Sequence, residues 1–124
     1  MKYYKCDKCG NTFEVVIDAA IVPVCCDSHM KIIESNTDEK GSKEKHIPVY
    51  TKDKNEVCVD VGSILHPMED DHYIEWISLE TTSGRYRKYL KPGDKPCVTF
   101  LLSDDEDVIN IYAYCNVHGL WSLK

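Results

Sequence analysis

Apolar residues in the C-terminal part of the chain recur at every second position, which is the period of a β-strand. The segments 57–61 and 109–113 show this alternation most clearly. It is expected where one face of a strand is buried and the other faces water. No window of comparable length has a convincing 3.6-residue apolar period, so we expect helices to be minor.

Short runs of strand-forming residues follow one another through this part of the chain, each bounded by turn-forming or charged residues. They cover residues 46–51, 57–62, 73–79, 85–90, 97–102, 108–115 and 120–123. Seven short strands at this spacing predict an antiparallel β-sandwich of immunoglobulin-like size. Cys58 and Cys97 lie in two of the runs. We expect both to pack in the core, because free cysteine is among the most buried residue types.

The N-terminal segment has a different character. Its first thirty-odd residues hold four of the seven cysteines. A segment this short cannot bury enough apolar surface to fold unaided, so it needs a metal or disulfide bridges. Residues 35–45 are polar, charged and contain glycine, which is typical of a linker. We therefore predict two domains, residues 1–37 and 38–124, with the boundary near residues 36–41.

Composition narrows the possible partners and the cellular compartment. The 124 residues carry a formal net charge of −6, so no excess of Lys and Arg is available to neutralise phosphates. We expect neither nucleic acid nor a membrane as a partner. The N-terminus lacks a cleavable apolar leader, and no long apolar run follows, so we expect a soluble, cytoplasmic protein. An odd number of cysteines in a reducing compartment points to metal ligation more than to disulfides.

Four cysteines form the first candidate site. Cys6 and Cys9 are separated by two residues. This spacing lets both thiolates bind one ion while backbone N–H groups point at the sulfurs. Cys25 and Cys26 are adjacent, and they can reach one ion only with a distorted angle between them. Four thiolates fit zinc or a single iron, and the spacing does not decide which. His29 is expected at the surface or behind the ligands, since four thiolates already complete a tetrahedron.

Four histidines and one cysteine form the second candidate site. His66 and His72 lie on one predicted loop, Cys115 and His118 share a two-residue knuckle, and His46 heads the first predicted strand. These five donors exceed what tetrahedral zinc takes, and they suit a five-coordinate iron with one open position. The alternative is that they are ordinary loop histidines around a structural cysteine.

Several of these motifs resemble those of known metalloproteins. Residues 1–15 and 23–30 resemble desulforedoxin, a small rubredoxin-like protein with one iron in four thiolates, and the adjacent cysteine pair is the most specific feature. Residues 44–48, 66–77 and 115–121 resemble the motifs of superoxide reductases, in the order and relative placement of that family. The matches span nearly the whole chain and are similar to the two-iron class, the desulfoferrodoxins.

The resemblance implies roles for individual residues. A ferrous ion would have the thiolate of Cys115 on its axis and the substrate opposite the sulfur. The four imidazoles in the plane would be those of His46, His66, His72 and His118. Glu44 matches the residue that closes the open position in the oxidised enzyme. Lys45 matches the cation that attracts the anionic substrate.

The resemblance also implies an activity and partners. It predicts two iron ions per chain and a homodimer, with reduction of superoxide to hydrogen peroxide by electrons from an external donor such as rubredoxin. Two alternatives stay open. The chain could be an electron carrier in which the four-thiolate iron works and the second site is structural, or a zinc-binding module without redox activity.

Overall fold

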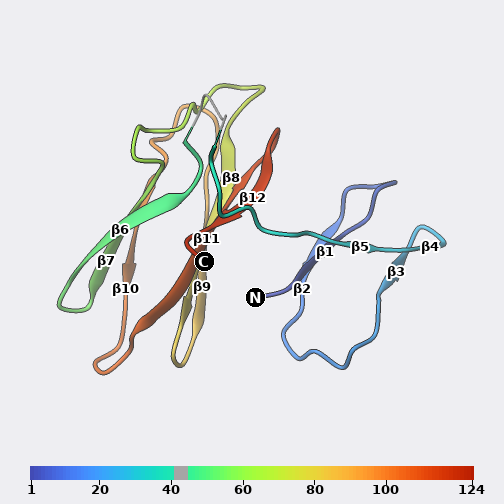
Figure 1. Cartoon of the computed structure of the whole chain (residues 1–124), viewed down its shortest axis with the longest axis horizontal. Coiled ribbons are helices and arrows are strands. Elements are labelled where there is room, and N and C mark those ends of the chain that lie inside the picture. The colour runs from blue at the N-terminus through green and yellow to red at the C-terminus, as the bar shows by residue number, and fades with distance from the viewer. Residues whose placement is uncertain (41–44) are drawn as a thin grey trace. The chain divides into compact units, whose positions relative to one another are not determined.

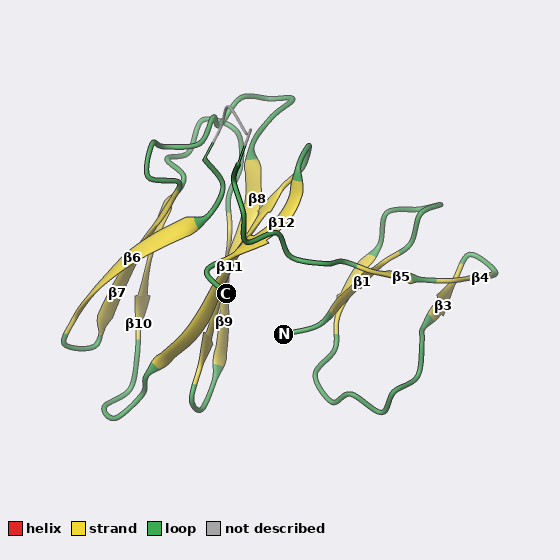
Figure 2. Cartoon of the chain, viewed as in Figure 1, coloured by secondary structure: helices red, strands yellow, loops and turns green. Residues whose placement is uncertain are grey.

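A computed structural model describes residues 1–40 and 45–124 of the chain. These residues divide into two compact units, Met1–Glu34 and Ser35–Lys124 (Figure 1). All of the regular secondary structure in the described residues is β-strand, with no helix (Figure 2). The predicted fold class, mainly β with a small metal-binding domain before an antiparallel sandwich, is confirmed.

The first unit has a three-stranded antiparallel sheet and a short hairpin. The sheet has the order β2-β1-β5, with β1 spanning Tyr3–Lys5, β2 Thr12–Glu14 and β5 Lys31–Ile32. The hairpin joins β3, Val24–Cys25, to β4, Ser28–His29. Its apolar cluster comprises five residues, the buried Tyr4, Cys6 and Met30 and the partly buried Val15 and Cys25. Such a core is too small to stabilise a domain by itself, as the sequence predicts.

The second unit is a sandwich of two antiparallel sheets. One sheet has the order β10-β7-β6, with β6 spanning Pro48–Asp53, β7 Glu56–Val61 and β10 Cys97–Leu101. The other has the order β12-β11-β8-β9, with β8 spanning Ile74–Thr81, β9 Arg85–Tyr89, β11 Val108–Cys115 and β12 Gly119–Ser122. Each of the seven predicted runs overlaps one of these strands, and the first run begins two residues before β6, so His46 lies just outside the strand that it was expected to head.

Alternating residues of the two sheets form the core of the sandwich. Val57, Val59 and Val61 are fully buried and belong to one cluster with Ile111 and other residues of the second sheet. The expected alternation fails over 109–113, because the side chain of Ile109 is 41% exposed whereas Asn110 and Tyr112, expected on the face toward water, are buried. The pairing of β11 with β8 shifts register between Val108 and Asn110, so Ile109 falls in an irregularity that turns its side chain outward.

Two further expectations need correction. Cys58 and Cys97 are only half-buried, because they lie on the face of the β10-β7-β6 sheet opposite to the buried valines. The start of the predicted linker is also part of the second unit. The backbone of Asn36 receives a hydrogen bond from Ser122 N (3.0 Å) and donates one to Leu120 O (2.8 Å), which adds a bridge beside β12.

Candidate metal centres

The second candidate site lies where several strand ends of the sandwich meet. His46 precedes β6 and His66 follows β7, and the start of β6 pairs with the end of β7. His72 precedes β8 and Cys115 ends β11, and the start of β8 pairs with the end of β11. His118 lies in the turn between β11 and β12. Antiparallel pairing therefore brings segments far apart in the sequence to common edges.

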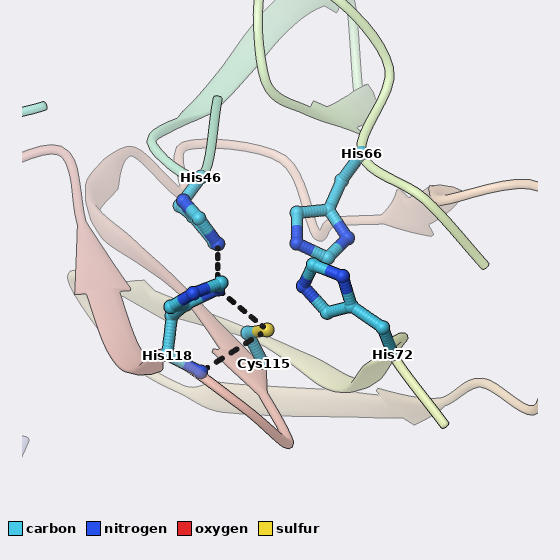
Figure 3. A group of neighbouring side chains, drawn as sticks. All are labelled: His46, His66, His72, Cys115 and His118. Carbon is cyan, nitrogen blue, oxygen red and sulfur yellow. Dashed lines mark hydrogen bonds between the residues drawn. The ribbon is translucent and has the colours of Figure 1, made fainter. Parts of the chain in front are cut away.

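Five side chains converge at this place, and we call them the histidine cluster (Figure 3). The cluster consists of His46, His66, His72, Cys115 and His118. Each of these residues offers one ligand atom, and the five atoms all lie within 4.8 Å of one another. Nε2 of His46 is 3.1 Å from Nδ1 of His118, which is 3.8 Å from Sγ of Cys115. The ring centroids of His66 and His72 are 4.8 Å apart. The structure thus brings together all five predicted donors.

The hydrogen bonds of the rings indicate which nitrogens face inward. Nδ1 of His66 lies 2.7 Å from the carbonyl oxygen of Pro67, which leaves Nε2 for the cluster. Nε2 of His72 is buried and has no hydrogen-bond partner within the described part of the chain. A buried nitrogen in this state is costly unless something binds it. Four nitrogens and one sulfur around a common point fit an iron ion.

Neighbouring groups hold the side chains of the histidine cluster in place. The indole of Trp121 stacks on the ring of His46, with centroids 4.4 Å apart and an interplanar angle of 13°. Nε1 of Trp121 donates to the carbonyl oxygen of His118 at 3.2 Å. The backbone N–H of His118 donates to Sγ of Cys115 at 3.4 Å, which favours a thiolate. His118 is exposed, whereas His46, His66 and Cys115 are buried, so His118 lies at the solvent-facing edge of the cluster.

Lys45 directly precedes His46 in the chain. Nζ of Lys45 lies 3.6 Å from a carboxylate oxygen of Glu39, and the Lys45 side chain is 37% exposed. The other oxygen of Glu39 accepts a hydrogen bond from Ile47 N at 2.7 Å. Glu44, predicted to close the open position, lies outside the described residues. The contacts of Glu39 could not be predicted from the sequence, because the fold determines which residues lie beside it.

The four cysteines of the first unit also converge. Their sulfurs lie within 4.8 Å of one another, with Cys25 Sγ at 3.6 Å from Cys9 Sγ and 3.9 Å from Cys26 Sγ. A tetrahedron with metal–sulfur bonds of about 2.3 Å has edges of about 3.8 Å. The spacing therefore fits one metal ion, and no disulfide joins any of the seven cysteines, all of which lie in the described residues. His29 is exposed in β4 and is not among the converging side chains.

The local backbone explains how adjacent cysteines can share an ion. Cys25 ends β3, and Cys26 and Asp27 form the turn to β4 with φ values of 52° and 58°. Two consecutive residues with positive φ are typical of a tight type I′ hairpin turn. The change of conformation between Cys25 and Cys26 swings the second sulfur toward the first. The turn thus provides the distorted angle between the two cysteine side chains that we expected from their adjacent positions.

The protonation of these thiols favours a bound cation. A hydrogen bond from the backbone N–H of Cys9 lowers the pKa of Cys6 to about 6. The neighbouring sulfurs of Cys9 and Cys6 raise the pKa of Cys25 to about 12. Crowded thiolates repel one another, so all four can be ionised near neutral pH only when a positive ion lies among them.

Comparison with known proteins places the chain in a family. Residues 36–124 match the family described as Desulfoferrodoxin. The chain is 48% identical over 121 residues to the desulfoferrodoxin homolog of Archaeoglobus fulgidus, covering 98% of this chain and 94% of that protein. It is 46% identical to the desulfoferrodoxin of Nitratidesulfovibrio vulgaris, with the same coverage. Among the described residues no helix is long and apolar enough to cross a membrane.

A solved structure resembles the whole chain. The superoxide reductase of Treponema pallidum has a TM-score of 0.80 and 35% identity, and the match covers 99% of this chain and 96% of that one. The four-cysteine group and the histidine cluster agree with the two iron ions per chain that the resemblance implies. Family match, full-length relatives and fold lead to one conclusion: the chain belongs to the desulfoferrodoxin family.

Proposed function

We propose that the protein is a superoxide reductase that works at an iron ion held by the histidine cluster. The observation that carries this proposal is the convergence of four imidazoles and one cysteine sulfur from distant segments, with His118 exposed at the edge. Superoxide gains one electron and two protons and leaves as hydrogen peroxide. An external donor, such as rubredoxin, returns the electron.

We propose ligands for this ion atom by atom. The nitrogens would come from His46, His66, His72 and His118, and the sulfur from Cys115. Ferrous iron, when bound there, supplies the electron that superoxide gains. The backbone N–H of His118 stabilises the negative charge on the sulfur of Cys115. Buried rings of His46 and His66 exclude water from one side of the site.

Two charged residues have proposed roles beside the open side. Lys45 presents a half-exposed ammonium group next to a ligand, and this charge would attract the superoxide anion despite the acidic balance of the chain. Glu44 is proposed, from the resemblance alone, to occupy the open position in the oxidised state. Protons would come from water that reaches the exposed edge at His118.

The four-cysteine group is proposed to hold the second iron as a one-electron centre, with Cys6, Cys9, Cys25 and Cys26 as ligands. Sulfur spacings of 3.6 and 3.9 Å support this. We also infer a cytoplasmic location, which seven cysteines without a disulfide among them support.

The chain is proposed to form a homodimer through its first unit. This small unit exposes many apolar side chains. They are Phe13, Val16, Ile17, Ile21, Val22, Val24 and Ile32, at 43–84% exposure. Covering them with a second copy of the chain would remove apolar surface from water and so stabilise the dimer. Light scattering should give twice the mass of one chain, and a monomeric mass would refute this assembly.

Pulse radiolysis of the fully reduced protein tests the proposed activity. Stoichiometric superoxide should oxidise the iron of the histidine cluster rapidly. The variant Cys115→Ser should lose this reaction and keep the absorption of the four-cysteine iron. Undiminished turnover in that variant would refute the role of the sulfur. Metal analysis separates the alternatives: about two irons per chain supports the reductase, and zinc in both sites supports a module without redox activity.

A further inference from the structure

Asn116, which lies between two proposed ligands, makes three hydrogen bonds to the segment that carries a third. Its side-chain oxygen accepts from the backbone N–H of Tyr73 at 2.9 Å. Its side-chain nitrogen donates to the carbonyl oxygen of Asp71 at 3.0 Å. Its backbone N–H donates to the carbonyl oxygen of Tyr73 at 3.1 Å. The amide therefore spans the residues on both sides of His72.

The backbone of His72 is also fixed, but from the other direction. Its N–H donates to Glu69 O at 3.2 Å, and its carbonyl oxygen accepts from Glu69 N at 2.9 Å. These bonds shape a turn within the 66–73 loop, and they do not join that loop to the Cys115–His118 turn. The bonds of Asn116 make this connection.

We propose that Asn116 is a positioning residue that joins the two chelating pairs, so that His66 and His72 close on the same ion as Cys115 and His118. This inference rests on the ligand set proposed above. We call the hydrogen bonds of Asn116 to Asp71 and Tyr73 the clamp. It matters most for His72, since neither nitrogen of this ring makes a hydrogen bond within the described part of the chain, whereas Nδ1 of His66 is held by the carbonyl oxygen of Pro67. The ring is placed by its backbone, and Asn116 holds that backbone.

The chemistry of the clamp requires an amide of this length. One end must accept from an N–H and the other must donate to a carbonyl oxygen. An ionised aspartate has the same shape but only acceptors, so one of its oxygens would face the carbonyl oxygen of Asp71. Alanine would lose both side-chain bonds. Neither substitution touches a ligand atom.

Iron release from the reduced, full-length protein to an excess of a ferrous chelator measures the effect. Groups that orient metal ligands typically change metal affinity by about 10- to 100-fold when they are replaced. We expect Asn116→Ala and Asn116→Asp to lose iron from the histidine cluster at least about tenfold faster than the wild type. Release from the four-cysteine site of the same chain should not change. The ferric electron paramagnetic resonance signal should also shift, because His72 is displaced.

A matched control comes from the far end of the sandwich. Asn55 lies in the turn between β6 and β7, and its side-chain nitrogen donates to Asp104 at 2.6 Å. Asn55→Ala should lower stability without changing iron release or the ferric signal. His72→Ala serves as the positive control for the ligand set, and it should lose iron from the cluster.

The outcomes separate this inference from the proposed function. If His72→Ala loses iron while both Asn116 variants bind it as tightly as the wild type and keep its ferric signal, the clamp is refuted and the ligand set stands. If His72→Ala retains iron fully, the proposed ligand set is wrong. If Asn116→Ala fails to fold, the isosteric Asn116→Asp decides by the same release rates.

Discussion

At the residue scale, the carboxylate of Glu39 contacts the residues on both sides of the proposed ligand His46. One oxygen accepts from Ile47 N at 2.7 Å, and the other lies 3.6 Å from the ammonium group of Lys45. The first bond orders the backbone beside the ligand. The second partly cancels the charge that is proposed to attract superoxide. Glu39 would therefore weaken the proposed attraction of superoxide by Lys45, while its other oxygen orders the backbone next to His46.

Glu39→Gln separates these two effects, since glutamine can still accept from Ile47 N but carries no charge. The association rate with superoxide should rise about twofold at low ionic strength, because one negative charge several ångströms from the site is removed. The gain should vanish in high salt. Pulse radiolysis across a salt series measures this. Lys45→Ala should show the opposite change, and equal low-salt rates in wild type and Glu39→Gln would contradict the electrostatic coupling.

Gly62 allows the backbone before His46 to approach β7. Its φ is +85°, and an added Cβ would lie 2.5 Å from both Lys45 O and Ile64 O. Gly62→Ala should destabilise the fold by about 2 kcal/mol or more, since the left-handed conformation alone costs about 1–2 kcal/mol. Urea unfolding measures the loss. Gly93→Ala is the control, because its φ is +89° but nothing lies within 4 Å of an added Cβ; equal losses would show that the close approach has no cost.

At the scale of elements, the carboxylate of Glu106 ties strands of one sheet to a loop. It accepts from the hydroxyl groups of Thr81 in β8 and Tyr86 in β9 (2.9 Å for Tyr86), and from the backbone N–H of Ser103 at 3.1 Å. The hydrogen bond from Thr81, followed by that from Ser103, holds the pKa of Glu106 below its ordinary value. The ionised form is thus favoured in the folded state.

Glu106→Gln should lower the free energy of unfolding near pH 7. A carboxyl group with a depressed folded pKa contributes stability above its unfolded pKa of about 4.3, and this contribution is lost as pH falls through the folded pKa. The difference between wild type and variant should therefore shrink below about pH 4. Urea unfolding of both proteins from pH 7 to pH 3 measures it. A difference that stays constant over this range would exclude the carboxylate as its source.

The strands of the sandwich could be predicted because each encodes its own pattern. Val57, Val59 and Val61 alternate with residues that are less buried, so the local sequence alone defines β7 and its inner face. The prediction that Ile109 is buried was wrong, because a shift of register depends on the partner strand, which the local pattern does not reveal. The prediction that Cys58 packs in the core was wrong, because residue type alone does not say which face of a strand is covered.

At the scale of the whole molecule, the sites could be predicted only in part. The chelating pairs are visible in the sequence because their members are close along the chain, and the resemblance joined them into one set. The supporting contacts could not be found in this way. Asn116 hydrogen-bonds to two residues that lie 43 and 45 positions earlier in the chain. Glu39 accepts a hydrogen bond from Ile47 N, although the residues between them include the four that the structure does not describe. Pairings of this kind are determined by strand register.

The two units should differ in their dependence on metal. Two of the five residues in the apolar cluster of the first unit, Cys6 and Cys25, are proposed ligands, whereas the second unit has a large core of its own. Removal of both irons should therefore unfold residues 1–34 and leave the sandwich strands folded. Amide NMR spectra should lose dispersion for the first unit only, and zinc should restore it, because four thiolates also bind zinc. A metal-free protein whose residues 1–34 keep their native amide shifts would show that apolar packing suffices there.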